Sequence, residues 1–460
     1  MSDYDVAIIG GGIVGAAIAR ELGAFDLRIV LLEARPDVGD GTSKANTALL
    51  HSGYDTTPGT LEGRLVRRGY DLLGDYAGRV GIPVERTGAL LVAWTPEELE
   101  ALPALEAKAR ENGSENCAPV DPGEIYRRMP DLGPGALGAL EVPDESITCT
   151  WTTNLALATE AVLRGVELRT GHPVQRVAVG PERTALTTPH GTIGARLVVN
   201  AAGLGADAID ARFGNDRFTV TPRRGELLVF DKLARPLVNQ ILLAVPSRLG
   251  KGVLISPTVY GNVMLGPTAE DLDDKTATGT SEAGFAFLRE RGMRLMPRLF
   301  EEEVTATYAG LRATVPGGDY LIEYDPEQRY VLVGGIRSTG LTAGLGIAEY
   351  VRDLLAGAGV PLTPRDELPA PVTMPNLGES FPRPYQDADR IAADPEYGRI
   401  VCFCERVTAG EIRDAYASPL PPHDLGGLRR RTRAMNGRCQ GFYCGGEVAA
   451  LVAAHAGAAP

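Results

Sequence analysis

The sequence predicts an α/β protein with two larger domains and a small C-terminal one, and three observations support this. The chain opens on a buried strand, a glycine-rich turn, a helix and a second buried strand. Two further glycine-rich strand-to-helix joints occur near residues 200 and 335. Four of the six cysteines lie between residues 402 and 444, after a proline-rich stretch.

Length, composition and charge narrow the class of protein. The 460 residues exceed one small core, so two or three domains are expected, and 44% hydrophobic with 23% charged residues is typical of a globular protein. The net charge of −13 argues against nucleic acid as a partner, because phosphate binding needs clustered cations. The acidic start and the charge-interrupted apolar segments predict neither a signal peptide nor a transmembrane helix. The expected location is the cytoplasm, with membrane docking only through a partner.

The first thirty residues have the pattern of a Rossmann-like, dinucleotide-binding unit. Gly10, Gly12 and Gly15 follow the first strand in G-x-G-x-x-G spacing, and Glu33 ends the second strand. The first glycine permits a tight turn, the second lets the backbone approach a pyrophosphate, and the third lets helix and strand pack closely. The helix N-terminus attracts the phosphates, and Glu33 can accept hydrogen bonds from ribose hydroxyls. The whole pattern therefore predicts a nucleotide site.

A loop with few core residues follows at Gly39 to Thr60 and should lie near the bound nucleotide. Its Ser43, Lys44 and Asn46 can hydrogen-bond a phosphate or a ring. His51 can exchange a proton near neutral pH, or it can simply stabilise the loop. The residues alone leave both interpretations of His51 open.

Further along, periodic apolar residues predict helices and strands in alternation. The expected helices span residues 61–81, 96–112, 155–163, 282–294 and 341–355. The expected strands span residues 88–94, 225–231, 253–255, 262–265 and 330–333, with a small β-meander over residues 167–188. Residues 132–149 should be a glycine- and proline-rich connection, and the eight prolines of residues 361–399 predict a linker.

Residues 195–209 repeat the pattern of strand, glycine turn and helix. Gly203, Gly205 and Ala208 fit G-x-G-x-x-A spacing, which is compatible with a second dinucleotide. No acidic residue ends a following strand at the right distance, however. The strand is therefore expected to return to the first sheet, where its turn would touch the same cofactor.

Three segments resemble the D-amino-acid-oxidase-like flavoprotein superfamily over about residues 1–360: the G-x-G-x-x-G unit, the NAAG turn at 200–203 and GGIRSTGLT at 334–342. The resemblance implies that all three contact one FAD, with the third placing a helix N-terminus at the flavin N1/O2 edge, where reduced flavin carries negative charge. The cofactor-binding residues that it implies are Gly10, Gly12, Gly15, Glu33, Ala34, Arg35, Thr42, Ser43, Lys44, Asn46, Val174, Ala202, Gly203, Gly335, Arg337, Gly340, Leu341 and Thr342.

The same resemblance supplies two candidate catalytic residues, Arg312 and His51. YAGLRATVP is similar to a G-x-R-P segment whose arginine clamps an anionic substrate group over the flavin, although Ala313 stands where the family often has proline. A planar guanidinium suits carboxylate or phosphate; the alternative for Arg312 is a surface salt bridge. His51, by the resemblance, would take the hydroxyl proton as hydride moves to flavin N5.

The C-terminal cysteines form a C-x-C pair, Cys402 and Cys404, and a C-x4-C pair, Cys439 and Cys444. Four thiolates in two close pairs fit zinc or an iron–sulfur cluster, and C-x-C is the poorer spacing for zinc. CFCERVTAGEI, LRRRTR and NGRCQGFYC resemble the bacterioferritin-associated-ferredoxin-like [2Fe-2S] domain over residues 400–452, which implies a [2Fe-2S] cluster on these cysteines. An empty or disulfide-bonded site is the remaining alternative. Arginines 429–433 would stabilise the cluster, dock an acidic redox partner or simply form a solvated helix face.

These resemblances divide the chain into FAD-binding parts at 1–85, 151–215 and 326–360, substrate-domain parts of α+β type at 86–150 and 216–325, a linker at 361–398 and an iron–sulfur domain at 399–460. They imply an FAD-dependent dehydrogenase that oxidises a small anionic hydroxy compound and passes electrons through the cluster to an acceptor protein or a quinone-linked membrane partner. The cysteine domain is similar to that of anaerobic glycerol-3-phosphate dehydrogenase large subunits, which makes sn-glycerol 3-phosphate the first expected substrate.

Other functions stay open from the sequence. KANTALLHSGYDTTPGTL also looks close to L-2-hydroxyglutarate dehydrogenases, so a 2-hydroxy acid is the alternative substrate. An amino-acid or amine dehydrogenase would use the same arginine. A non-catalytic flavin and cluster relay is the alternative of a different class.

Overall fold

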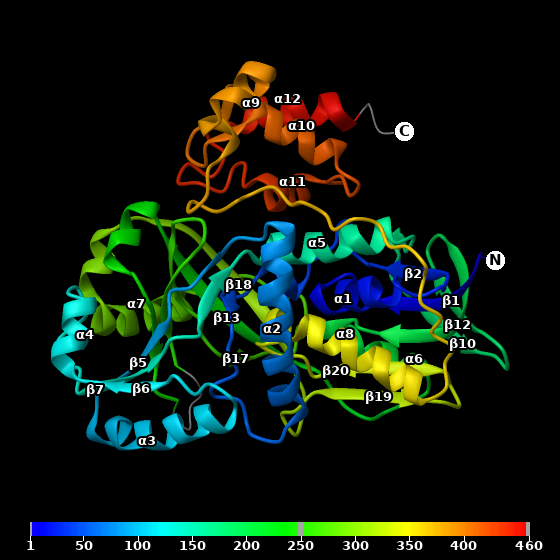
Figure 1. The fold of residues 1–460 in the computed structure, drawn as a ribbon, viewed down its shortest axis with the longest axis horizontal. Helices are drawn as coiled ribbons and strands as arrows, with labels where there is room; N and C mark the ends of the chain where they lie inside the picture. The colour runs from blue at the N-terminus through cyan, green and yellow to red at the C-terminus, as the bar shows by residue number, and fades with distance from the viewer. Residues whose placement is uncertain (1, 247–251, 457–460) are drawn as a thin grey trace.

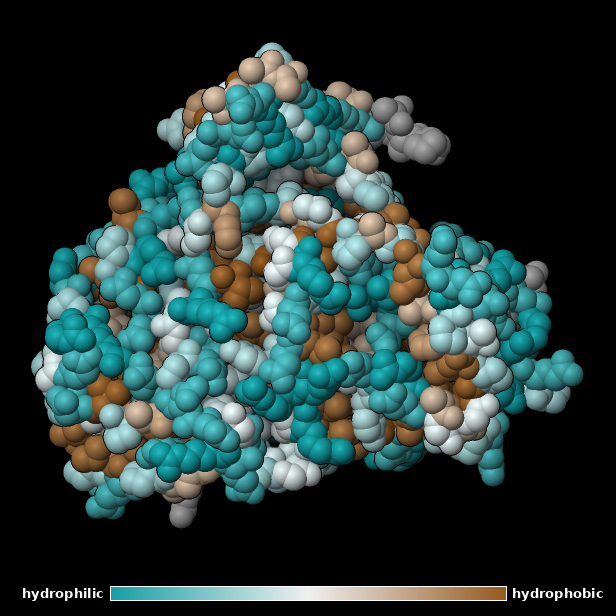
Figure 2. Space-filling model, in the orientation of Figure 1, coloured by the Kyte–Doolittle hydropathy of each residue, from teal (hydrophilic) through white to brown (hydrophobic). Residues whose placement is uncertain are grey.

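The computed structural model describes residues 2–246 and 252–456. Two large sheets lie side by side, and the C-terminal domain packs against one side of the body that they form (Figure 1). On the face shown in Figure 2, hydrophobic residues are scattered among hydrophilic ones. In the part of the chain that the structure describes, none of the helices combines the length and apolar character needed to cross a bilayer.

The first sheet is mainly parallel in its centre. Its order is β10-β11-β12-β1-β2-β9, with β20 beside the second half of β12 and β19 beside β20. Helices α1, α5, α8 and α2 pack together, and α6 packs on β12 and β20. The strands are β1 (Ser2–Ile9), β2 (Ile29–Leu32), β9 (Glu167–Arg169), β10 (Arg176–Val179), β11 (Thr184–Thr188), β12 (Gly191–Asn200), β19 (Leu321–Asp325) and β20 (Tyr330–Gly334).

The carboxyl ends of four parallel strands meet at one edge of this sheet. Ile9 lies opposite both Leu32 and Asn200, and Asn200 lies opposite Leu332. The three glycine-rich turns after β1, β12 and β20 therefore come together, as the ends of parallel strands do in open α/β sheets. The expectation that the strand ending at residue 200 returns to the first sheet is confirmed, because β12 pairs with β1. A second, separate dinucleotide unit is excluded by this pairing.

The second sheet is mostly antiparallel and includes the eleven-residue strand β18. Its order is β17-β13-β16-β15-β14-β5-β7-β6, and β18 pairs with β13. One face packs on α7 and α4 through a separate apolar core. The strands are β5 (Ala89–Ala93), β6 (Ala118–Val120), β7 (Gly138–Val142), β13 (Thr221–Phe230), β14 (Ile241–Ala244), β15 (Leu254–Pro257), β16 (Val263–Gly266), β17 (Glu270–Asp271) and β18 (Val304–Thr314).

The helices predicted to begin at residues 61, 96, 282 and 341 begin within one residue of those positions, whereas α5 begins five residues before the predicted residue 155. Thr60, Thr95 and Ser281 each cap a helix with a side-chain oxygen. The helices are α1 (Ile13–Leu22), α2 (Leu61–Val80), α3 (Pro96–Glu111), α4 (Pro122–Arg128), α5 (Thr150–Leu163), α6 (Ala206–Arg212), α7 (Glu282–Leu295), α8 (Gly340–Gly357), α9 (Ala388–Ala393), α10 (Ala409–Ala417), α11 (Leu425–Thr432) and α12 (Gly445–Ala456).

Local patterns mispredict three elements. The supposed connection at 132–149 contains β7 and β8 (Ser146–Thr148), which pairs with β3 (Leu49–Leu50) and β4 (Val84–Glu85). The meander over 167–188 does not form, because β9 pairs with β2 at the opposite edge of the sheet from β10. Strand β18 is not predicted by any local pattern. Each of these elements depends on a partner far away in the sequence.

The C-terminal domain is formed by α9 to α12 and a hairpin of β21 (Ile400–Cys402) and β22 (Val407–Thr408). The segment before it runs along the first domain, where Asp26 and Ala24 exchange backbone hydrogen bonds with residues 363–365. The division into domains stays a prediction. The pairing of β19 with β20 would move its boundary at residue 325 to before Leu321.

Candidate active site

The turn after β1 requires glycine at Gly10 and Gly15 and leaves little room for a side chain at Gly12. Gly10 has φ of +108°, and a Cβ there would lie 2.5 Å from the carbonyl oxygen of Ala201. A Cβ on Gly15 would lie 1.8 Å from the carbonyl oxygen of Gly10, a clash that excludes every residue with a side chain. A Cβ on Gly12 would meet Ser43 Oγ at 3.0 Å. The three glycines therefore hold helix α1 and the turn in the close contact that a dinucleotide cradle needs.

Glu33 faces this turn from the end of β2. Its carboxylate accepts hydrogen bonds from the backbone N–H groups of Gly11 (2.7 Å) and Arg35 (2.8 Å). Burial raises the pKa of Glu33, although both hydrogen bonds act in the opposite direction. The acid is thus fixed beside the first turn, where the sequence places the ribose contact, and Ala34 and Arg35 follow it.

The loop after Glu33 straps the first turn to the second sheet. Ser43 Oγ accepts from the backbone N–H of Ile13 (2.9 Å) at the start of α1, and Thr42 Oγ1 donates to the carbonyl of Leu311 on β18 (2.9 Å). Asn46 Oδ1 accepts from Thr150 Oγ1 (2.9 Å). The loop residues predicted to bind a phosphate or a ring therefore lie between the start of α1 and strand β18.

The third glycine turn brings the N-terminus of α8 to the same place. Gly335 has φ of +69°, and Arg337 donates to the carbonyl of Gly318 (2.9 Å). The side chain of Thr339, which precedes α8, makes no capping bond to the helix. Thr342, in the first turn, accepts at Oγ1 from the backbone N–H of His51 (2.9 Å). This uncapped, positive helix end fits the flavin edge that the sequence predicts for it.

The other expected cofactor residues lie around these turns. Ala202 and Gly203 form the turn between β12 and α6, where Gly203 has φ of +56° and a Cβ would meet open space. Gly340 and Leu341 open α8. Val174 is buried in the core on the other side of the first sheet. Glycine turns, acid, loop and helix end together fit an FAD laid across the sheet edge.

His51 lies between two carboxylates. Its Nδ1 is 2.8 Å from Glu145 Oε1 and its Nε2 is 3.1 Å from Asp55 Oδ1. The same Glu145 oxygen accepts from the backbone N–H and the hydroxyl of Ser52 (2.7 and 2.8 Å). Burial lowers the pKa of His51, but the two carboxylates, Glu145 first, outweigh it and raise that pKa to about 10.

The role predicted for His51 as a proton acceptor stays a prediction. Because the two carboxylates raise its pKa to about 10, the ring is protonated at neutral pH, and proton uptake there would involve the carboxylates as well. Sequence reasoning missed both of its partners. Asp55 stands one helical turn's spacing from His51 and could have been suspected, whereas Glu145 lies in the segment predicted as a connection.

Arg312 points from β18 without a counter-ion. Its Nη1 donates to the carbonyl of Thr268 (3.3 Å), and within the described chain no carboxylate pairs with it. Burial lowers its pKa to about 10, and the positive charges of Arg223 and Arg337 act in the same direction. By contrast, Arg223 makes a two-pronged pair with Asp271 (2.6 and 2.8 Å). Among the described residues, the half-buried Arg312 thus has no anion partner and forms no surface salt bridge.

The four C-terminal thiols associate in two pairs. Cys404 interacts most strongly with Cys439, and Cys444 with Cys402. Backbone N–H groups, that of Tyr443 first, lower the pKa of Cys439, whereas burial raises that of Cys444 to about 12. Among the described residues no three His, Cys, Asp or Glu side chains form one close set around a single ion. Two thiol pairs with backbone N–H groups directed at sulfur fit a cluster whose two irons each take two thiolates.

Three arginines of the run are buried and paired with acidic residues, so the solvated helix face predicted as the alternative does not form, whereas stabilisation of the cluster stays a prediction. Arg430 and Arg431 are buried against Asp37 of the first domain. Arg433 is paired with Glu405 (2.8 Å) and lies 3.9 Å from the ring centre of Tyr260. The run therefore joins the C-terminal domain to the rest of the chain and is not free to dock a partner.

Comparison with known families agrees with both parts of the site. Residues 5–354 match the FAD dependent oxidoreductase family, and residues 400–454 match the BFD-like [2Fe-2S] binding domain. The first match covers more than half of the chain and contains all three glycine turns, His51 and Arg312. The second contains the four cysteines.

Two of the individual relatives match over nearly the whole chain. A glycerol 3-phosphate dehydrogenase of Caloramator mitchellensis is 34% identical over 99% of this chain and 95% of its own length. A chain of the anaerobic glycerol-3-phosphate dehydrogenase of Escherichia coli K12 is 30% identical over 97% of this chain and 88% of its own. Among solved structures, the FAD-bound L-alpha-glycerophosphate oxidase of Mycoplasma pneumoniae matches with a TM-score of 0.77 and 26% identity over 82% of this chain and all of that one. The chain belongs to the FAD dependent oxidoreductase family and carries a BFD-like [2Fe-2S] binding domain after it.

Proposed function

We propose that this FAD-dependent oxidoreductase is a dehydrogenase of sn-glycerol 3-phosphate that sends electrons through its [2Fe-2S] cluster to a quinone-linked acceptor. The observation that carries the proposal is Arg312, a half-buried cation with no counter-ion in the described chain, beside the cofactor loop. The relatives named for glycerol 3-phosphate, which match nearly the whole chain, support the choice of substrate.

The charges around Arg312 favour a phosphate. Arg223 lies opposite it on β13, and Arg337 enters from the turn before α8. Both act on Arg312 through their positive charge. A phosphate with close to two negative charges relieves this repulsion more than a single carboxylate does. Arg312 would therefore hold the phosphate and orient the carbinol carbon toward the flavin edge at α8.

His51 serves as a fixed positive charge next to the start of α8. FAD, when bound, would supply the electron acceptor for the carbinol hydride. His51 with Asp55 and Glu145 forms a trio in which two carboxylates share one imidazolium. Such a trio can take up the proton that the substrate hydroxyl loses, which a lone imidazolium cannot do. His51 thus acts as part of the trio.

The surface around the cluster ligands suits electron delivery to another molecule. Phe403, Phe442 and Tyr443 are 73%, 83% and 81% exposed and stand next to the cysteines. On the inner side, contacts run from the neighbour of Cys404 to the cofactor loop through Glu405, Arg433, the stacked Tyr260 and Trp151, and the carbonyl of Lys44. We place the electron acceptor, a protein or a membrane-bound partner, at these exposed aromatic residues. Any association with a membrane would then be peripheral and would occur through that partner.

Anaerobic reduction of the flavin by a panel of compounds tests this function. We expect glycerol 3-phosphate to bleach the flavin absorbance, with L-2-hydroxyglutarate and amino acids inert at equal concentration. Bleaching by L-2-hydroxyglutarate or by an amino acid alone would reassign the substrate. A flavin that no hydroxy or amino compound reduces would favour the non-catalytic relay.

The cluster ligands have their own test. The Cys402→Ser/Cys444→Ser variant should lose the visible absorbance of the cluster and its electron paramagnetic resonance signal after reduction. Flavin bleaching by substrate should be unchanged, because the cysteines lie outside the substrate site. Reoxidation of the reduced flavin by a quinone analogue should slow strongly, because electrons can no longer pass through the cluster. Cys117→Ser is the matched control, because that thiol is buried in the main core. Stoichiometric zinc in the wild-type protein would refute the cluster.

A further inference from the structure

Helix α11 of the cysteine domain clamps one acidic residue of the first domain. Asp37 is fully buried, and Arg430 and Arg431 are each 6% exposed. Arg430 donates to Asp37 Oδ2 (2.8 Å), and Arg431 donates to both carboxylate oxygens (2.7 and 3.1 Å). Both arginines hold the pKa of Asp37 below its ordinary value, with Arg431 the stronger, although burial opposes them. The pairs join residues almost four hundred positions apart.

Asp37 lies two residues before the loop that begins at Gly39 and borders the cofactor site. Arg430 also pairs with Asp40 (2.7 Å), which in turn pairs with Lys44 (2.7 Å). Between these residues, the backbone N–H of Gly39 donates to the carbonyl of Gly11 in the first glycine turn (3.0 Å). Helix α11 therefore contacts this segment at two residues, Asp37 and Asp40. The segment is in turn hydrogen-bonded to the dinucleotide turn.

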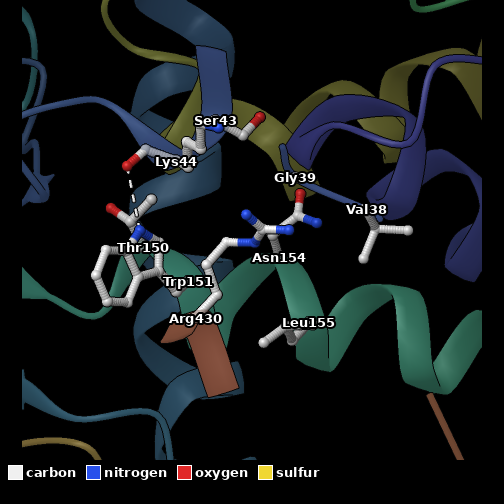
Figure 3. A pocket seen from close by; sticks show the side chains of 9 residues that line it. All are labelled: Val38, Gly39, Ser43, Lys44, Thr150, Trp151, Asn154, Leu155 and Arg430. Atoms are coloured by element: carbon white, nitrogen blue, oxygen red, sulfur yellow. Dashed lines mark hydrogen bonds between the residues drawn. The ribbon is translucent and has the colours of Figure 1, made fainter. Parts of the chain in front are cut away.

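A small pocket lies at this junction (Figure 3). It is lined by residues of the loop, of α5 and of α11, namely Val38, Gly39, Ser43, Lys44, Thr150, Trp151, Asn154, Leu155 and Arg430. Arg430 extends from α11 into it, toward Asn154 and Gly39. Nε of Arg430 and Oδ1 of Asn154 are buried without hydrogen-bond partners. The cysteine domain thus forms part of the wall behind Ser43, the residue that contacts the start of α1.

We infer that the [2Fe-2S] domain is a structural part of the FAD site: through Asp37 and Asp40, Arg430 and Arg431 position the loop that supports the glycine turn expected to bind the FAD pyrophosphate. These arginines are positioning residues, because they act through the loop. Without the guanidinium groups of Arg430 and Arg431, Asp37 would be a carboxylate covered by α11 with no cation, which disfavours the loop conformation seen here. Coupling between sites is reciprocal, so FAD binding tightens the docking of the cysteine domain by the same factor. The inference needs FAD binding but not the proposed substrate.

FAD affinity of the apoprotein measures the coupling. We expect Asp37→Asn and Arg430→Ala each to weaken FAD binding by about tenfold, a usual size for coupling between sites. Arg429→Ala is the matched control, since Arg429 lies on the same helix but bonds Asn436 and Met435 within its own domain. Affinity is read from flavin fluorescence without substrate, so the result is independent of the dehydrogenase proposal.

Hydrogen exchange supplies a second readout that general destabilisation does not reproduce. FAD should slow amide exchange in α11 of the wild type, and this slowing should vanish in Asp37→Asn. The visible spectrum of the cluster verifies that each variant is folded, and Arg430→Lys serves if Arg430→Ala does not fold. Unchanged FAD affinity in Asp37→Asn, an equal loss in Arg429→Ala, or an α11 insensitive to FAD would each overturn the inference.

Discussion

Replacing Arg312 by alanine will lower kcat/KM for the anionic substrate by about a hundredfold or more, because removing one side of a desolvated charge pair costs about 2–5 kcal/mol. Arg312 has no other anion to neutralise it in the described chain, so its charge is available to the substrate. Its pKa of about 10 keeps it charged at neutral pH, despite burial and the neighbouring arginines. The measurement is steady-state kinetics with an artificial electron acceptor, together with flavin content.

Two further variants separate the role of Arg312 from a general change of charge. Arg223→Ala removes a neighbouring cation that is already paired with Asp271, so we expect a much smaller effect. Arg312→Lys keeps the charge but loses the planar fork, and should recover only part of the activity. Equal losses in Arg312→Ala and Arg223→Ala, or full activity in Arg312→Ala, would remove the basis for an anion site at Arg312.

Glu145→Gln is expected to shift the pH dependence of the reaction and to destabilise the fold. Glu145 is the first cause of the raised pKa of His51, so loss of its charge should bring that pKa down from about 10 toward the ordinary value. Activity above neutral pH should then fall by about a hundredfold, in the range of proton-transfer contributions. Breaking a buried ion pair should also cost about 3–5 kcal/mol of stability. A pH–rate profile and chemical unfolding measure the two effects.

The raised pKa of His51 determines how the stability of the fold changes with pH. A histidine whose pKa is raised by folding contributes fully below its unfolded value of about 6.5. The contribution is lost as the pH rises from there through about 10. Ser52→Ala is the control, because it removes one hydrogen bond to Glu145 but leaves the carboxylate. A Glu145→Gln enzyme with the wild-type pH profile would show that His51 does not depend on Glu145.

The parts of the fold that follow from short stretches of chain were predictable. The strand, turn and helix from β1 to α1 are specified by neighbours, because Gly10 and Gly15 pack against each other. The meeting of the three glycine turns followed from the rule for parallel strand ends. The helices α2, α3 and α7 carry their own periodicity and caps.

What escaped prediction depends on distant partners. Strand β18 is recognisable only beside β13, and Glu145 matters only because folding brings it to His51. The arginines of α11 are a further example. The sequence shows that they are charged, but it does not show that Asp37, far away in the chain, is their partner. The chain could thus indicate a candidate arginine and a candidate histidine, while the partners of the histidine needed the structure.

The first sheet combines strands that are far apart in the sequence, and this affects the order in which the chain can fold during synthesis. β12 joins β1 on one side and β20 on the other, so its closure waits until residue 334 has left the ribosome. Until then, the N-terminal βαβ unit keeps apolar surface unpaired, which is a hazard for a nascent chain. The C-terminal domain is built from continuous local contacts and can fold late and quickly. The proposed coupling therefore predicts that FAD binds tightly only late in synthesis, because helix α11 leaves the ribosome long after the loop that it holds.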